Sequence, residues 1–100
     1  MNIEKQINEI TYKYFVSRKQ YNLMSFSSGE DDYFNPYYVY YRNVEIAFSK
    51  LNETEQLIIN NDYFYNDYYD WWKLLFPKKK YQKMKREAVR KFVRLVYENC

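Results

Sequence analysis

The stretch PKKKYQKMKREAVRKFVRLV, residues 77–96, decides the fold and gives the first indication of function. On a helical wheel at about 100° per residue, its apolar and basic side chains separate into opposite sectors. The apolar sector holds Tyr81, Met84, Ala88, Phe92 and Leu95. The opposite sector holds Lys79, Lys83, Arg86, Arg90 and Arg94. The pattern predicts an amphipathic helix over residues 78–98, about 31 Å long at ~1.5 Å per residue, which begins after Pro77.

The segment before this helix contains a cap signal and a second apolar run. Asn52 is followed three residues later by Glu55 and then by Leu57-Ile58-Ile59. This is an N-x-x-E version of the capping box, which predicts a helix from Asn52 to about Tyr63. After a short connection at 64–66, the stretch DYYDWWKLLF (67–76) predicts a brief helix. Its inward-facing side chains would be Tyr68, Trp71, Trp72 and Leu75.

The N-terminal half also follows helical spacing. Ile3, Ile7, Ile10 and Tyr14 share one helical face, which predicts a first helix over residues 2–24. SFSSGEDDYFN (25–35) reads as an acidic loop. Pro36 suits the first turn of a helix over 36–50, although YYVYY at 37–41 has enough β-propensity to form a short strand instead. We therefore expect an all-α protein, with an N-terminal helix and acidic loop at 1–35 and a helical domain at 36–100.

Composition argues against an enzyme. The chain has no His, one Cys and one Gly. These counts exclude a disulfide framework, His/Cys zinc sites, catalytic triads with His, and Gly-rich phosphate loops. The acidic run Glu30-Asp31-Asp32 lacks the alternating spacing and Gly of a calcium loop, so a solvated loop is favoured. We expect no catalytic residue, no metal and no cofactor.

Hydropathy and the single Cys point to a cytoplasmic protein with no membrane partner. No run of 18 apolar residues occurs. The first ten residues, MNIEKQINEI, lack the apolar core of a signal peptide. A single cysteine fits a reducing compartment.

Charge is strongly asymmetric along the chain. Residues 1–70 hold six basic and eleven acidic residues, a net charge of −5, whereas residues 71–100 hold ten basic and two acidic residues, a net charge of +8. A solvated helix face usually mixes both signs, but Glu87 is the only acid in residues 71–97. The pattern therefore favours contact with nucleic acid over a plain solvated face. Membrane-surface binding is less favoured because the core needs the apolar face. The acidic part could shield the basic helix when no polyanion is bound.

Aromatic residues leave two alternatives open. The chain has 14 Tyr. A helix cannot bury all of Tyr37, Tyr38, Tyr40 and Tyr41, which hints at a protein partner or a homodimer. An AT-rich coding genome explains the tyrosines equally well. Trp71-Trp72 could stack on single-stranded nucleic acid, but adjacent helical residues diverge by about 100°, so a core role is favoured.

Residues 51–97 resemble a known family. The pieces LNETEQLIIN, DYYDWWKLLF and PKKKYQKMKREAVRKFVRLV are similar to the helix-turn-helix of sigma-70 region 4-like proteins, and most of all to ArpU-type phage transcriptional regulators. Tyr81 and Lys85-Arg86-Glu87-Ala88 stand where those proteins show a tyrosine and a Lys-x-Glu-Ala-type segment. Leu75-Phe76-Pro77 departs from the family, whose turn usually has a small residue and a Ser or Thr cap.

The resemblance implies a helix-turn-helix over residues 67–98 and a DNA-binding transcriptional regulator or an RNA polymerase-associated factor. The last helix would enter the major groove of double-stranded DNA with its N-terminal half. It would place five residues near base edges and flanking phosphates: Lys78, Lys79, Gln82, Lys83 and Arg86. Arg90 and Arg94 would contact backbone phosphates. The alternative is a helical protein–protein interaction module, with RNA polymerase or another regulator as partner and without specific DNA readout.

Overall fold

The computed structural model describes residues 2–28 and 35–99 as a helical protein. It has four α-helices: α1 (Ile3–Ser28), α2 (Pro36–Ser49), α3 (Glu53–Ile59) and α4 (Lys78–Asn99). A π-helical turn, η2 (Asn60–Phe64), continues α3, and a short 3-10 helix, η3 (Trp71–Leu74), precedes α4. These described residues contain no strand, so the expected all-α class is confirmed.

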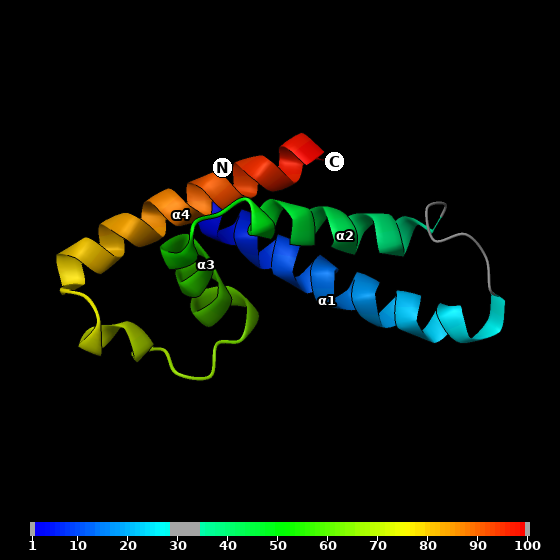
Figure 1. Cartoon of the computed structure of the whole chain (residues 1–100), viewed down its shortest axis with the longest axis horizontal. Coiled ribbons are helices and arrows are strands. Elements are labelled where there is room, and N and C mark those ends of the chain that lie inside the picture. The colour runs from blue at the N-terminus through cyan, green and yellow to red at the C-terminus, as the bar shows by residue number, and fades with distance from the viewer. Residues whose placement is uncertain (1, 29–34, 100) are drawn as a thin grey trace.

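The helices form an elongated body with extents of 50 × 27 × 24 Å. Figure 1 shows α1 and α2 as an antiparallel pair that reaches toward one end of the molecule. α4 lies across the other half of this pair, and α3 with the segment that follows it lies beside the N-terminal half of α4. The connection between η2 and α4 therefore lies at the end of the molecule opposite the C-terminal end of α1 and the start of α2.

The α1–α2 pair begins and ends close to the expected positions. α1 continues to Ser28 instead of ending at Met24, because residues 25–28 contain no Gly or Pro that would end a helix. The rest of the predicted acidic loop, including Glu30-Asp31-Asp32, lies outside the described residues. Asn35 caps α2 by accepting from the backbone N–H groups of Tyr37 (2.9 Å) and Tyr38 (3.4 Å). YYVYY is helical within α2.

The predicted capping box is present at the start of α3. The Asn52 side chain accepts from the Glu55 backbone N–H at 2.8 Å, and the Glu55 carboxylate accepts from the Asn52 N–H at 2.9 Å. The helical path then runs through η2 to Phe64, one residue beyond the expected end. Lys91 of α4 reaches the same Glu55 carboxylate at 3.0 Å, which joins this cap to α4.

The core is built where α4 meets α1, α2 and α3. Phe92 is fully buried, and its ring packs edge-to-face with those of Phe48 (6.4 Å) and Phe64 (6.0 Å). Tyr81 and Ala88 are buried as predicted, whereas Met84 and Leu95 are only half-buried. The face that α4 buries is rotated toward three valines that the wheel did not place in the apolar sector: Val89, Val93 and Val96.

The brief helix expected over residues 67–76 is much shorter in the structure. Only Trp71–Leu74 is helical, as a single 3-10 turn. Tyr68 and Leu75 were expected to face inward but are 75% and 58% exposed, and the two tryptophans are half-buried. Asn66-Asp67 favours a turn, and the contacts of Trp71 with Asp62 and of Trp72 with Tyr81 fix the rest of the segment.

We expect Asn52→Ala to destabilise the protein by about 1 kcal/mol, because the Glu55 N–H loses its partner and the reciprocal bond loses its geometry. The measurement is urea-induced unfolding followed by circular dichroism. Thr54→Ala is the matched control, since Thr54 is exposed in the first turn of the same helix. Equal losses for both variants would show that the box contributes nothing specific.

Candidate nucleic-acid interface

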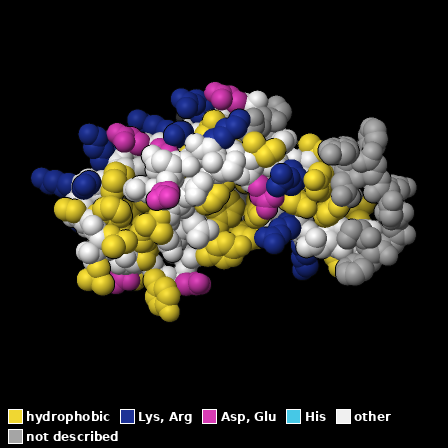
Figure 2. All heavy atoms as spheres, in the orientation of Figure 1, with side chains coloured by type: hydrophobic (Ala, Val, Ile, Leu, Met, Phe, Trp, Pro, Cys, Tyr) yellow, Lys and Arg dark blue, Asp and Glu magenta, His cyan; other side chains and the backbone are white. Residues whose placement is uncertain are grey.

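The basic residues predicted on the outer face of α4 form one exposed line, here called the basic stripe. It consists of Lys79, Lys83, Arg86, Arg90 and Arg94, all of which are exposed. Lys78 and Gln82, the other two predicted contact residues, are exposed beside it. Figure 2 shows Lys and Arg atoms along the edge of the molecule that α4 occupies. From Lys79 to Arg94 the stripe runs about 22 Å along the helix at ~1.5 Å per residue.

The stripe carries little internal neutralisation. Arg94 pairs with Glu98 one turn later at 3.7 Å, with both side chains more than 60% exposed. Exposed pairs of this kind hold their partners weakly and are screened by salt. Within the described part of the chain, no other stripe residue lies within 4.0 Å of a carboxylate. The stripe therefore presents its charge to solvent or to a ligand.

Two further cations of α4 point away from the stripe and dock the helix. Lys85 lies 3.6 Å from Asp62, and Lys91 lies 3.0 Å from Glu55. Lys85 also lies over the Tyr63 ring at 5.3 Å, a cation–π contact. These lysines engage acids from the segment before α4, so α4 separates its positive charge into an inward and an outward set.

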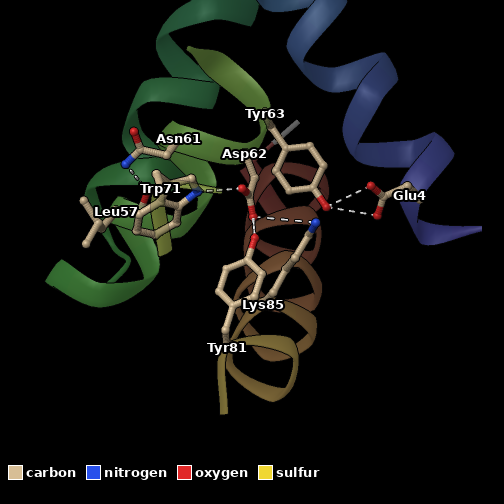
Figure 3. Close-up of polar contacts among 8 residues, drawn as sticks. All are labelled: Glu4, Leu57, Asn61, Asp62, Tyr63, Trp71, Tyr81 and Lys85. Carbon is tan, nitrogen blue, oxygen red and sulfur yellow. Dashed lines mark hydrogen bonds and ion pairs between the residues drawn. The ribbon is translucent and has the colours of Figure 1, made fainter. Parts of the chain in front are cut away.

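A buried carboxylate organises the N-terminal half of α4. The Asp62 side chain is 7% exposed and accepts a hydrogen bond from the Trp71 indole N–H at 2.8 Å and another from the Tyr81 hydroxyl. Figure 3 shows Trp71, Tyr81 and Lys85 converging on it from η3 and α4. The Trp72 ring stacks on the Tyr81 ring, with 4.4 Å between the ring centroids. We call Asp62, Trp71, Trp72, Tyr81 and Lys85 the Asp62 network.

A second tyrosine joins this region to α1. The Tyr63 hydroxyl donates to the Glu4 carboxylate at 2.9 and 3.0 Å, as Figure 3 shows. Burial raises the pKa of Tyr63, and its hydrogen bond to the carboxylate raises it further. Burial and the Asp62 carboxylate raise the pKa of Tyr81 in the same way. Both hydroxyls therefore keep their protons and remain donors.

Sequence reasoning did not find the Asp62 network. From the sequence, Asp62, Asp67 and Asp70 are expected only to cap helix ends or to interact with helix dipoles, and any acid near a helix end can do this. The partners of Asp62 lie nine, nineteen and twenty-three positions further along the chain. The only available signal was composition, since two Trp and five Tyr follow Asp62 within the next nineteen residues, and a buried Trp or Tyr needs a hydrogen-bond partner.

A pocket of about 370 Å³ opens between α1, α2 and η2. Inside it, the Tyr14 hydroxyl donates to Glu45 at 2.9 Å, and Arg42 pairs with the same carboxylate at 3.0 Å. Burial, reinforced by this hydrogen bond, raises the pKa of Tyr14 to about 12. The pocket thus presents the rings of Phe48 and Phe64 beside an acid that two neighbours already engage.

Among the described residues, no group of three His, Cys, Asp or Glu side chains is placed to hold a metal ion. No helix within 2–28 or 35–99 has the length and apolar character to cross a membrane. No family model, no curated protein and no solved structure matches the chain. The resemblance of residues 51–97 to sigma-70 region 4-like proteins stays a prediction.

We expect Asp62→Asn to cost about 2 kcal/mol of stability, because an amide loses the charge that faces Lys85 and turns a donor toward the Tyr81 hydroxyl or the Trp71 indole. Urea unfolding measures the loss, and native-state tryptophan fluorescence reports whether the two indoles become more exposed. Asp70→Asn is the control, because Asp70 is exposed and its side chain caps nothing. An unchanged midpoint for Asp62→Asn would contradict the role assigned to the network.

We expect stability to fall in alkaline solution. The unfolded tyrosines ionise near pKa 10, whereas Tyr14 ionises near 12 in the folded protein, and the pKa values of Tyr63 and Tyr81 are raised as well. Above pH 10 the unfolded chain therefore releases protons that the folded chain retains. Stability is full below pH 10 and is lost as pH rises toward 12 and beyond.

Thermal unfolding at a series of pH values tests this expectation, with tyrosinate absorbance as the titration readout. Tyr14→Phe removes one of the shifted groups and should flatten the loss. Tyr68→Phe is the control, since Tyr68 is 75% exposed. A wild-type melting temperature that stays constant while the tyrosines ionise would refute the coupling.

Proposed function

We propose that this protein binds double-stranded DNA through the basic stripe of α4. The observation that carries the proposal is a line of five exposed cations on a helix whose opposite face is fixed in the core. Phosphates supply the charge that such a line attracts, and the three arginines suit both bidentate phosphate contacts and guanine edges. The acids nearest to α4, Asp62 and Glu55, are engaged by Lys85 and Lys91 and leave the stripe available.

Docking would use the two halves of α4 differently. The N-terminal half, which lies beyond most of the core, would enter the major groove with Lys78, Lys79, Gln82, Lys83 and Arg86. Arg90 and Arg94 would contact phosphates further along the duplex. Residues 67–77 would take the place of the first helix of a helix-turn-helix. The helical part of this segment is a single turn, Trp71–Leu74, in place of the full helix of the family that the sequence resembles. The Asp62 network would provide the support that a full helix provides there.

The biological role that we propose is regulation of transcription, either directly or beside RNA polymerase. This part rests on the resemblance of residues 51–97 and on the basic stripe together. The chemistry required is recognition alone, through electrostatic docking and direct readout by a few long side chains.

The experiment that tests DNA binding is fluorescence anisotropy with a mixed-sequence duplex at several salt concentrations. Counterion release predicts that log affinity falls linearly with log salt, with a slope of about −0.9 for each phosphate neutralised. Five to seven contacts then give a slope of roughly −4 to −6. Absence of binding even at low salt would reject the proposal.

We expect the double variant Lys83→Ala, Arg86→Ala to weaken binding and to reduce the magnitude of the salt slope by about 2, because two phosphate contacts are lost. The matched control is Lys5→Ala, Lys19→Ala, which removes the same charge from exposed positions of α1. The control should leave the slope unchanged. Equal effects of the two doubles would show that overall charge, and not the stripe, governs binding.

One observation favours a second candidate function, a protein–protein interaction module. The connection before α4 exposes several large apolar side chains, of which Leu74 is 98% exposed. The four tyrosines at 37–41 of α2 form a weaker candidate surface, because only Tyr37 is exposed and the other three are half-buried. Tyr41 packs against Tyr14 and Tyr38. Under this function the Lys83→Ala, Arg86→Ala variant would keep its partner, and a pull-down would recover RNA polymerase or another regulator.

A further inference from the structure

The connection between η2 and α4 displays an unusual concentration of apolar surface. Five large side chains within eleven residues are more than half exposed, and we call them the loop patch: Tyr65 (53%), Tyr68 (75%), Tyr69 (78%), Leu74 (98%) and Leu75 (58%). Exposed apolar clusters rimmed by polar residues are typical of interaction sites on proteins.

The backbone that carries the loop patch is fixed. The Trp71 N–H donates to the Tyr68 carbonyl at 3.3 Å, and the Leu75 and Phe76 N–H groups both donate to the Trp72 carbonyl at 2.9 Å. Trp71 is held by Asp62, and Trp72 by the Tyr81 ring. Because both tryptophans are held by these partners, the residues that flank them are turned outward. The exposure is therefore built into the fold.

Opposite charges border the patch. Asp67 and Asp70 lie on the chain beside Tyr68 and Tyr69, and Lys78-Lys79-Lys80 follow Leu74 and Leu75 at the start of α4. Figure 2 shows hydrophobic atoms at this end of the molecule, with Lys and Arg atoms on the α4 side and Asp and Glu atoms on the opposite side. Within the described residues, none of these five charged side chains lies in an ion pair. Lys73, inside the patch, lies over the Tyr69 ring at 6.0 Å.

We propose that the loop patch is the contact surface of a homodimer, in which a second copy of this chain docks about a two-fold axis. A two-fold interface places each surface against itself, so that residue i meets residue j and residue j meets residue i. An apolar centre with an acidic edge and a basic edge is complementary to its own rotated copy. The tyrosines and leucines would meet across the axis, and Asp67 and Asp70 would face the partner's Lys78–80.

The acidic edge of the loop patch favours a second copy of the chain over two other binding partners, DNA and an anionic lipid surface. DNA or an anionic lipid surface seated on the loop patch itself, and not on the basic stripe, would place phosphates beside Asp67 and Asp70, which would repel them. A second copy uses the acids and the lysines together. The dimer does not depend on DNA binding. Because it would engage Lys78 and Lys79, DNA bound to a dimer would contact the rest of each stripe, Lys83, Arg86, Arg90 and Arg94. The two stripes would then have a fixed relation, as two half-sites on DNA require.

Sedimentation equilibrium of the full chain without DNA is the first test. We expect a concentration-dependent dimer, and Leu74→Asp should raise its dissociation constant by more than about tenfold, because a charge would enter the apolar centre. This variant should keep its helical circular dichroism spectrum, since Leu74 packs on nothing. Leu23→Asp, at a 60% exposed position of α1, is the control and should leave the dimer intact.

A charge swap tests the two-fold geometry itself. One variant carries Asp67→Lys and Asp70→Lys, and the other carries Lys78→Glu, Lys79→Glu and Lys80→Glu. Each variant alone should be monomeric, because the two edges of its loop patch carry charges of the same sign and repel those of a second copy. An equimolar mixture should form a heterodimer, because the basic edges of the first face the acidic edges of the second.

Three results would overturn the proposal: a monomeric wild-type chain, a dimer unaffected by Leu74→Asp, or no heterodimer from the mixed swap variants. A monomeric wild type that binds vesicles of anionic lipid through Leu74 would assign the patch to membranes instead. DNA affinity and its salt slope are measured separately. Failure of the dimer would therefore leave the DNA-binding proposal standing, and failure of DNA binding would leave the dimer standing.

Discussion

The Asp62 carboxylate is the constraint on which the positions of the basic stripe and the loop patch depend. A charge buried without partners would cost several kcal/mol, so its position is stable only while Trp71, Tyr81 and Lys85 contact it together. Those partners belong to η3 and to the first two turns of α4. Their convergence sets the path of the connection and the rotation of α4 about its own axis. The rotation of α4 turns the basic stripe outward. The path of the connection before α4 turns the loop patch outward.

The parts of this structure that the sequence predicted are those that depend on neighbours a few residues apart. The capping box at Asn52 and Glu55 is a local exchange of hydrogen bonds, and it was found directly. The prediction of a helix over residues 67–76 was wrong because the conformation of this segment depends on contacts with Asp62 and Tyr81, which hydrophobic periodicity does not reveal. The same limit applies to Val89: the wheel identified an apolar face, but its centre is set by the helices packed against it.

The candidate site was predictable to a similar extent. The spacing of Lys83, Arg86 and Arg90 placed them on one exposed face, and the structure confirms their exposure. Charge alone could not separate them from Lys85 and Lys91, which have the same chemistry but face acids brought close by the fold. The loop patch could not be predicted either, since Tyr68 and Leu75 fit an inward-facing helix just as well on spacing alone.

Tyrosine hydroxyls satisfy three of the acids in the N-terminal part of the chain. Tyr14 donates to Glu45, Tyr63 to Glu4 and Tyr81 to Asp62, so three acids from three different elements are engaged as hydrogen-bond acceptors. A tyrosine hydroxyl satisfies a carboxylate without adding a positive charge and brings a large ring to a small core. In this arrangement these three acids hold α1, α2 and η2 in place. Among the stripe residues, all of which the structure describes, only Arg94 has an internal ion pair, to Glu98, so the stripe stays open to the external polyanion that we propose.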